Sequence, residues 1–150
     1  MRLKLQTDYA LRTLLFLAAA RRICSVDDIA GAFGISREHL VKVVQELARR
    51  GFVKTTVGRA GGAQLAREPA SITVAEVVEA FEGRQQVLEC LAQPEVCVLE
   101  PGCDLRRLLI KAEQSFYAVL GTATIADLTR PRRKGGLANI RSAITSGDST

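Results

Sequence analysis

The sequence has no tryptophan, one histidine, one methionine and few aromatic residues, and it lacks any long hydrophobic run. Its longest apolar stretch, residues 14–20, is far shorter than the roughly 20 residues that a membrane-spanning helix needs. No small-residue cleavage site follows a long apolar segment near the N-terminus, so we expect no secretory signal. The single histidine, His39, has no second histidine as a partner, which argues against histidine-based catalysis or metal binding. These absences favour a cytoplasmic protein that does not enter a membrane.

The 150 residues, 47% hydrophobic and 25% charged, are typical of a soluble globular chain with one domain, or one domain and an appendage. A chain of this length can bury a core large enough to fold without disulfides. The four cysteines are therefore expected to be thiols, metal ligands or redox sensors, as is usual in the cytoplasm.

Positive charge is concentrated in one part of the sequence. The formal net charge is +5, and residues 34–67 carry seven basic against two acidic residues. Residues 71–128 carry four basic against nine acidic residues, and residues 129–150 carry five against one. This asymmetry favours a nucleic-acid-binding face joined to an acidic part with another role. Without a matching motif, an unevenly charged solvated surface would be the simpler interpretation.

Three helices are predicted in the N-terminal third of the chain. The first covers residues 8–22, and the second begins at the capping-box pattern of Ser25 and ends before Gly34. Ser36 can cap a third helix. One face of that helix is apolar and consists of Leu40, Val43, Val44 and Leu47. A short second helix joined by a tight turn to a longer third is the layout of a helix-turn-helix, here at about residues 26–50.

A β-hairpin is predicted directly after these helices. Residues 52–57 and 63–66 have strand patterns and flank a glycine-rich turn. A hairpin that follows a recognition helix is a wing, here residues 52–66. A further capping-box pattern at Thr73 predicts a helix that closes this unit at Gly83. The predicted fold class is therefore mainly α with a small β-hairpin, with a winged helix-turn-helix over residues 1–83.

The remainder divides into three segments. Residues 84–103 show no periodic pattern and are expected to form a loop. Asp104 can cap a long helix that reaches about Asp127, and its apolar stripe exceeds what one small winged domain can cover. Residues 104–128 are therefore expected to pair with a second copy of the chain. Residues 129–150 are small, polar and basic and are expected to be disordered.

The first residues of the third helix are the candidates for reading DNA, because this end of a recognition helix faces base edges in the major groove. Arg pairs with guanine, Glu accepts from cytosine, and Ser or His reaches bases or phosphates. The candidates are Ser36, Arg37, Glu38, His39 and Lys42. Arg59, at the wing tip, is a candidate for a phosphate or minor-groove contact. Simple solvent exposure of His39 and an ordinary turn at residues 61–62 are the alternatives.

Three of the cysteines lie close together in the predicted loop. Cys90, Cys97 and Cys103 have the spacing C-x6-C-x5-C, which is not the C-x2-C spacing of a structural zinc site. Three thiolates can instead hold an iron–sulfur cluster, although four ligands are usual. Three unrelated thiols, or a redox pair, are the alternatives. Cys24 lies among apolar residues and is expected to be a buried structural thiol.

Several segments in combination resemble one bacterial family, the winged-helix iron–sulfur transcription factors of the IscR and NsrR type. They are residues 7–12, the turn and helix at 34–44, the wing turn at 58–62 and the cysteine loop that runs into Asp104. The resemblance covers roughly residues 1–128. Arg106 stands where the IscR-like branch has a histidine ligand, so the sequence is more similar to the nitric-oxide-sensing, NsrR-like branch.

The resemblance implies a function and a ligand set. Cys90, Cys97, Cys103 and Asp8 would hold an iron–sulfur cluster, with a 4Fe-4S cluster favoured and a 2Fe-2S cluster compatible with the same ligands. The protein would be a homodimeric repressor, not an enzyme, that binds palindromic double-stranded DNA in the bacterial nucleoid and loses DNA affinity when nitric oxide attacks the cluster. Without the resemblance, Asp8 is simply an N-cap or first-turn carboxylate favoured by the helix dipole.

Three alternatives stay open at this point. A regulator could use the same ligands to sense iron supply, cluster supply or redox state. An iron–sulfur electron-transfer protein belongs to another class, and the basic segment and the absence of a cofactor fingerprint argue against it. A metal-free thiol switch is the third.

Overall fold

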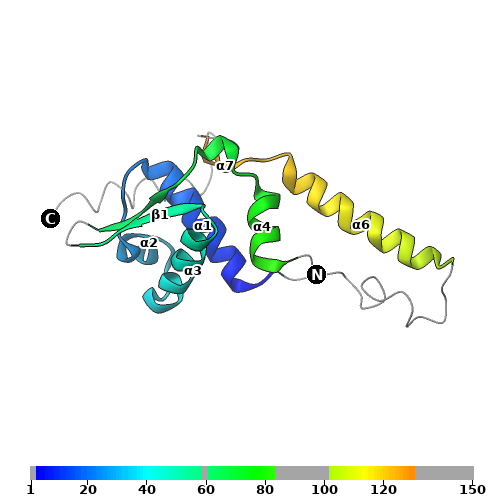
Figure 1. The fold of residues 1–150 in the computed structure, drawn as a ribbon, viewed down its shortest axis with the longest axis horizontal. Coiled ribbons are helices and arrows are strands. Elements are labelled where there is room, and N and C mark those ends of the chain that lie inside the picture. The colour runs from blue at the N-terminus through cyan, green and yellow to red at the C-terminus, as the bar shows by residue number, and fades with distance from the viewer. Residues whose placement is uncertain (1–2, 59–60, 84–101, 131–150) are drawn as a thin grey trace.

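The computed structural model describes residues 3–58, 61–83 and 102–130, and in these ranges the chain is mostly helical with one two-stranded antiparallel sheet (Figure 1). The elements in chain order are α1 (Leu5–Ala20), α2 (Val26–Phe33), α3 (Arg37–Arg49), β1 (Val53–Thr56), β2 (Gly62–Leu65), η1 (Pro69–Ser71), α4 (Val74–Glu82), α6 (Asp104–Gly121) and α7 (Ile125–Thr129). The predicted fold class, mainly α with a small hairpin, is confirmed.

Local capping interactions set the ends of the helix-turn-helix. Ser25 accepts a hydrogen bond from the backbone of Asp28, whose side chain accepts one from Ser25, which completes the predicted capping box. Gly34 ends α2 in the left-handed conformation, with φ of 63°, and Ser36 then caps α3. These interactions orient α3 relative to α2.

The hairpin is held on its inner side by the segment before α2. Val53 pairs with Leu65, and the backbone of Cys24 exchanges two hydrogen bonds with Ala63, at 2.9 and 2.8 Å. A Cβ atom on Gly62 would overlap with the carbonyl group of Cys24. Glycine is therefore required at this position so that the two backbones can approach each other.

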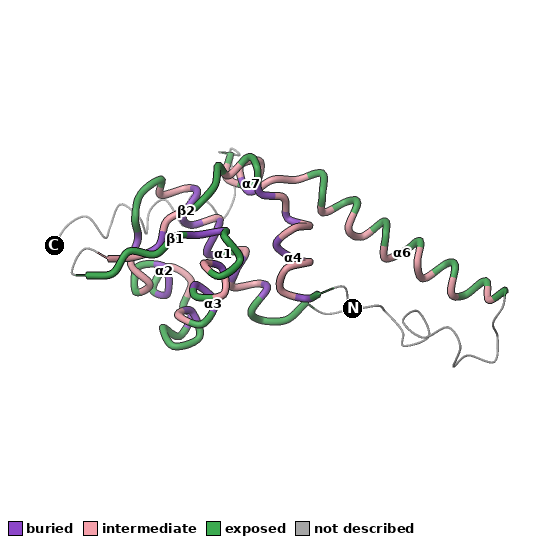
Figure 2. The backbone as a smooth tube through the Cα atoms, viewed as in Figure 1, coloured by how far each residue is buried: buried purple, intermediate pink, exposed green. Residues whose placement is uncertain are grey.

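The hydrophobic core lies between α1, the helix-turn-helix, the hairpin and α4. Its largest fully buried side chains are Phe16, Leu14, Leu17, Ile29, Leu40, Leu47, Ile72 and Ile125. Figure 2 shows that buried residues gather in this winged half, whereas α6 has none. The apolar face predicted for the third helix is confirmed, since Leu40, Val43, Val44 and Leu47 are all buried.

The C-terminal helix differs from the prediction of a single helix up to about Asp127. In the structure α6 ends at Gly121, and a separate helix, α7, begins at Ile125. Thr124 is the N-cap of α7 and forms a capping box with Asp127. The backbone of Ile125 donates to the carbonyl group of Ile72 at 2.9 Å, and its side chain is fully buried. The buried Ile125 side chain and the backbone bridge between Thr73 and Thr124 hold the returning chain on the winged half. No helix among the described residues is long and apolar enough to cross a membrane.

Candidate DNA-binding surface and metal centre

The start of α3 is exposed, as a surface that reads DNA must be. Ser36, Arg37, Glu38, His39 and Lys42 are all exposed. Most of them already interact within the chain. Ser36 Oγ accepts from the backbone N–H of His39 and shares a 3.0 Å hydrogen bond with His39 Nδ1, and Lys42 pairs with Glu38 at 3.2 Å. Arg37 pairs with Asp27 of α2 at 2.9 Å. Both of the latter pairs are exposed ion pairs, which contribute little and break easily when a phosphate or base competes.

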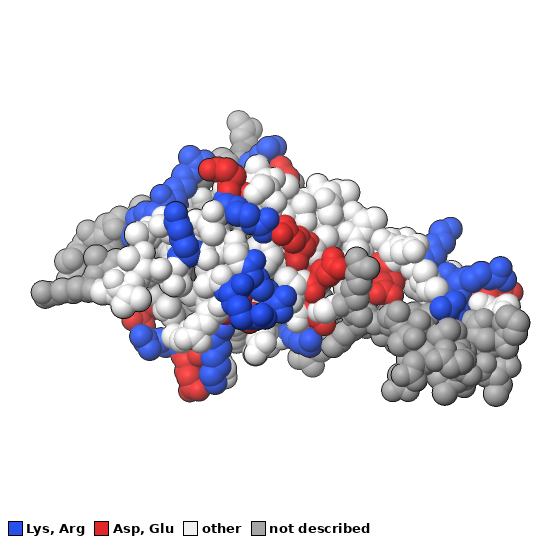
Figure 3. Space-filling view, viewed as in Figure 1, with Lys and Arg blue, Asp and Glu red and all other residues white. Residues whose placement is uncertain are grey.

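An open groove of about 360 Å³ lies between this surface and the hairpin. Its lining residues come from the start of α2, from α3 and from the hairpin, and they include Arg37, Thr55 and Thr56. Arg59, the predicted wing-tip contact, lies outside the described residues. Figure 3 shows Lys and Arg side chains spread over the winged half of the molecule. The described Lys and Arg residues of the basic segment are all exposed, and Arg37 and Lys42 lie in the first half of α3.

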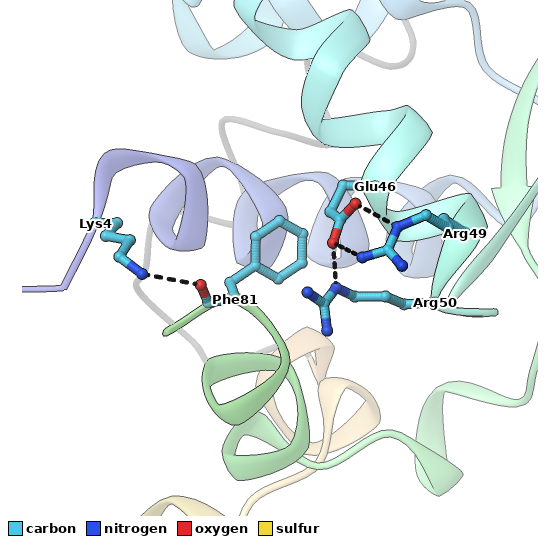
Figure 4. Close-up of polar contacts among 5 residues, drawn as sticks. All are labelled: Lys4, Glu46, Arg49, Arg50 and Phe81. Carbon is cyan, nitrogen blue, oxygen red and sulfur yellow. Dashed lines mark hydrogen bonds and ion pairs between the residues drawn. The ribbon is translucent and has the colours of Figure 1, made fainter. Parts of the chain in front are cut away.

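The other end of α3 carries a network that the sequence analysis did not identify (Figure 4). Glu46 accepts hydrogen bonds from Arg49, at 2.8 and 2.6 Å, and from Arg50. The hydrogen bonds from Arg49 and then Arg50 lower the pKa of Glu46 to about 2. The guanidinium of Arg50 also lies over the ring of Phe81 in α4, at 5.6 Å from its centroid.

Asp8 lies in the first turn of α1, which begins three residues earlier than predicted. It is not the N-cap, because that position is Lys4. Both carboxylate oxygens of Asp8 accept from Arg12 Nε at 2.9 Å, and the guanidinium of Arg12 lies 5.7 Å from the centroid of the Phe33 ring. Asp8 keeps 43% of its side-chain surface exposed, so a ligand or a second chain can reach it.

Of the three cysteines predicted to hold the cluster, Cys90 and Cys97 lie outside the described residues. The structure describes the third, Cys103. It is a partly buried free thiol at the N-cap of α6, where its sulfur accepts the backbone N–H of Arg106 at 3.5 Å. The N-terminal end of a helix favours anionic groups, so this position suits a thiolate ligand. Cys24 is buried, as predicted, and its sulfur donates to the carbonyl group of Arg22.

Within one chain the structure does not bring Asp8 and Cys103 together. Figure 1 shows the start of α6 at the far end of the molecule from α1. Among the described residues, no group of three or more His, Cys, Asp or Glu side chains could hold a metal ion. A centre that uses both Asp8 and Cys103 therefore needs a second chain or a different position of α6.

A buried carboxylate near Asp8 was also missed by the sequence analysis. Glu82, at the end of α4, accepts the backbone N–H of Lys4 at 2.7 Å and the hydroxyl of Thr7. Burial by itself raises the pKa of Glu82. The hydrogen bonds from Thr7 and Lys4 and the charge of Lys4 together lower the pKa by more, so the net shift is downward. Glu82 and Lys4 are 78 residues apart, which no local pattern reveals. The spacing of Asp8 and Arg12, by contrast, is an ordinary i,i+4 signal.

A helix-turn-helix with an exposed basic N-terminal end, followed directly by a β-hairpin wing, defines a winged-helix DNA-binding protein. Comparison with known families agrees, since residues 3–131 match the model of Rrf2, described as an iron-dependent transcriptional regulator. The chain therefore belongs to the Rrf2 family. It is a DNA-binding transcriptional regulator and not an enzyme.

Similar proteins support this assignment over nearly the whole chain. The HTH-type transcriptional regulator NsrR of Geobacillus kaustophilus is 44% identical over 88% of this chain and 92% of that protein. NsrR of Bacillus subtilis is 39% identical over 87% of this chain and 91% of that protein. Among solved structures, the global cysteine regulator CymR of B. subtilis matches with a TM-score of 0.73 and 25% identity, over 86% of this chain and 96% of that one. IscR of T. potens matches with a TM-score of 0.69 and 25% identity, over 85% of each chain.

Proposed function

We propose that this protein is a homodimeric repressor that holds an iron–sulfur cluster, binds palindromic operator DNA and loses DNA affinity when nitric oxide attacks the cluster. The observation that carries the proposal is the similarity, at 44% and 39% identity over most of the chain, to regulators named NsrR. Such a protein would act in the bacterial cytoplasm and nucleoid. The particular signal, nitric oxide, comes from the NsrR-like features of the sequence.

The proposed ligands are Cys90, Cys97, Cys103 and Asp8. Their donor set fits the cluster, because thiolates are the usual ligands of iron–sulfur clusters and a carboxylate is a weaker, more easily displaced ligand. When bound, the cluster would supply iron atoms that react with nitric oxide. Arg12 holds both oxygens of Asp8, so Asp8 must release or share Arg12 to bind iron. A 4Fe-4S cluster is favoured, and a 2Fe-2S cluster is the alternative for the same ligands.

The proposed dimer rests on the surface of α6. Exposed Leu105, Leu108 and Val119 lie on its apolar stripe, and no residue of α6 is buried in the single chain. A second α6 packed along this stripe would cover it. If the second chain also supplies its Asp8 to the cluster site of the first, the cluster would tie the two subunits together.

The proposed DNA contacts are Ser36, Arg37, Glu38, His39 and Lys42 of α3, together with Arg59 of the wing. Ser36 serves mainly as the cap of α3, and the exposed pairs of Arg37 and Lys42 can open to reach DNA. Replacing Arg37 and Lys42 should abolish a sequence-specific gel shift while leaving the fold unchanged. A gel shift that survives this double replacement would contradict the assignment of α3 as the reading helix.

The cluster is tested by anaerobic purification with iron and sulfide counts, before and after Asp8→Ala. We expect cluster absorption and iron in the wild type, and a less stable cluster in Asp8→Ala. Operator affinity is then measured after exposure to nitric oxide and, separately, to oxygen. Colourless protein without iron would contradict the cluster, and loss of DNA binding with oxygen alone would contradict nitric oxide as the signal.

A second candidate function uses the same site to sense iron or cluster supply. The family description as an iron-dependent regulator and the structural likeness to IscR favour it. Nitric oxide added to the cluster-bound protein separates the two functions. The proposed repressor then loses operator affinity, whereas a supply sensor changes its affinity only with the amount of cluster bound.

A further inference from the structure

The last turn of α4 contacts two helices, the C-terminal end of α3 and the start of α1. Arg50, at the C-terminal end of α3, lies over the ring of Phe81. The neighbouring residue, Glu82, binds Lys4 and Thr7 at the start of α1, one residue before Asp8. The chain continues from this turn directly into the residues that contain Cys90 and Cys97.

The contact of Arg50 with Phe81 is oriented on both sides. Glu46, one turn earlier in α3, binds the guanidinium of Arg50 and so fixes it over the ring (Figure 4). Phe81 packs against the hydrophobic core. Arg49 binds the same carboxylate, but the guanidinium over the Phe81 ring is that of Arg50, which makes Arg49 a natural comparison. A shift of the α4 turn would therefore be transmitted to α3 through Arg50 rather than through Arg49.

The contact of Glu82 with α1 is stronger than a surface contact. Glu82 is buried, and its carboxylate accepts from the backbone of Lys4 and the hydroxyl of Thr7. The ammonium group of Lys4 lies 3.7 Å from the other oxygen of Glu82, 3.3 Å from the carbonyl oxygen of Glu82 and 3.4 Å from that of Phe81. These contacts hold the start of α1, which carries Asp8, against the end of α4.

We propose that the last turn of α4, through Phe81 and Glu82, transmits the state of the cluster to the recognition helix. Phe81, Glu82 and Arg50 are positioning residues in this route. Ligand binding by Asp8 would act on the helical turn that Glu82 holds. That change would reach α3 through the contact of Arg50 with Phe81, beside the direct packing of α1 on α3. This inference rests on the proposed function, since it supposes that cluster and operator binding are coupled.

The test compares Arg50→Gln with Arg49→Gln, and adds Phe81→Leu and Glu82→Gln. For each protein, operator affinity is measured anaerobically at one salt concentration in the cluster-bound and the cluster-free form. The ratio of the two dissociation constants is the coupling, which for allosteric proteins is typically about 5- to 150-fold. Iron and sulfide counts and the thermal midpoint are recorded alongside, because a merely structural role would alter them and leave the ratio unchanged.

We expect Arg49→Gln to weaken both forms equally and to keep the wild-type ratio, since it removes one positive charge without touching Phe81. Arg50→Gln removes the same charge, but its ratio should fall toward one with iron content unchanged. Phe81→Leu and Glu82→Gln should both lower the ratio. Phe81→Leu does so without changing the charge of the protein. If either fails to fold or to retain iron, the Arg50→Gln and Arg49→Gln pair decides.

Two outcomes overturn the inference in distinguishable ways. A wild-type ratio above one that Arg50→Gln preserves as fully as Arg49→Gln overturns this route and leaves the proposed function intact. A wild-type ratio of one overturns the proposed switch itself, and the route with it.

Discussion

At the residue scale, the carboxylate of Glu82 provides what α1 lacks at its own N-terminus. Lys4, the N-cap of α1, makes no side-chain capping hydrogen bond, and Glu82 accepts its backbone N–H instead. A carboxylate at this end of a helix is also favoured by the helix dipole. The residue that stabilises the start of α1 therefore comes from the end of α4.

Glu82→Ala should lower the free energy of unfolding by about 2–3 kcal/mol, because it leaves Lys4 N–H and the Thr7 hydroxyl without their acceptor in a buried place. Urea denaturation of the purified protein measures the loss. The exposed Glu68→Ala is the control and should change stability by less than about 0.5 kcal/mol. Equal losses in the two variants would show that Glu82 has no special role.

Glu46 makes stability depend on pH. Its pKa in the folded protein, about 2, lies below the ordinary 4.5 because of Arg49 and Arg50. The ionised carboxylate therefore stabilises the fold above about pH 4.5, and this contribution is lost as the pH falls toward 2. Glu46→Gln should lower the thermal midpoint at pH 6 and have less effect at pH 3. Midpoint curves that stay parallel between these two pH values would contradict this assignment.

At the element scale, the helix caps and the turn glycines were predictable and the end of α6 was not. Ser25, Gly34 and Ser36 act through groups within four residues of themselves, so their roles can be read from spacing. The capping box of Thr124 and Asp127 is a local signal for a new helix start, which the prediction of one helix up to about Asp127 did not use. Burial of Ile125 against the winged half decided the break.

Alanine should have opposite effects at two glycines, Gly62 of the hairpin and Gly31 of α2. Gly62→Ala should destabilise the protein by about 1–3 kcal/mol, because its Cβ would overlap with the backbone of Cys24 and the two segments would have to separate. Gly31→Ala, in α2, is the matched control: nothing lies within 4 Å of the added Cβ, and alanine should stabilise the helix by about 0.5–1 kcal/mol. Thermal unfolding of both variants gives the sign, and a neutral Gly62→Ala would contradict the close approach.

At the scale of the whole molecule, α6 is the element that the single chain leaves uncovered. It extends away from the winged half, packs on α4 near its end and returns through α7 to α1 (Figures 1 and 2). Leu108 is 64% exposed and Val119 is 68% exposed. This arrangement separates the start of α6, and Cys103 with it, from Asp8.

The proposed dimer predicts that Leu108→Glu yields a monomer, because it places a charge in the centre of the apolar stripe. Gln114→Glu adds the same charge on the opposite face of α6 by helical spacing and should stay dimeric. Sedimentation velocity measures the mass of each, and gel shifts on a palindromic operator should weaken for Leu108→Glu alone. A dimeric Leu108→Glu with unchanged operator binding would exclude α6 as the interface.

The amino-acid sequence by itself determined the features that depend on near neighbours. These are the helix caps, the amphipathic third helix, the hairpin with its glycine turn, the basic segment and the spacing of the cysteines, and together they sufficed for the fold class and the family. Only the tertiary structure decided which distant residues meet. The pairing of Glu82 with Lys4 and Thr7, the contact of Arg50 with Phe81, the break after α6 and the separation of Asp8 from Cys103 all depend on packing between elements far apart in the chain. Such pairings arise from burial of the whole core, which no window of a few residues contains.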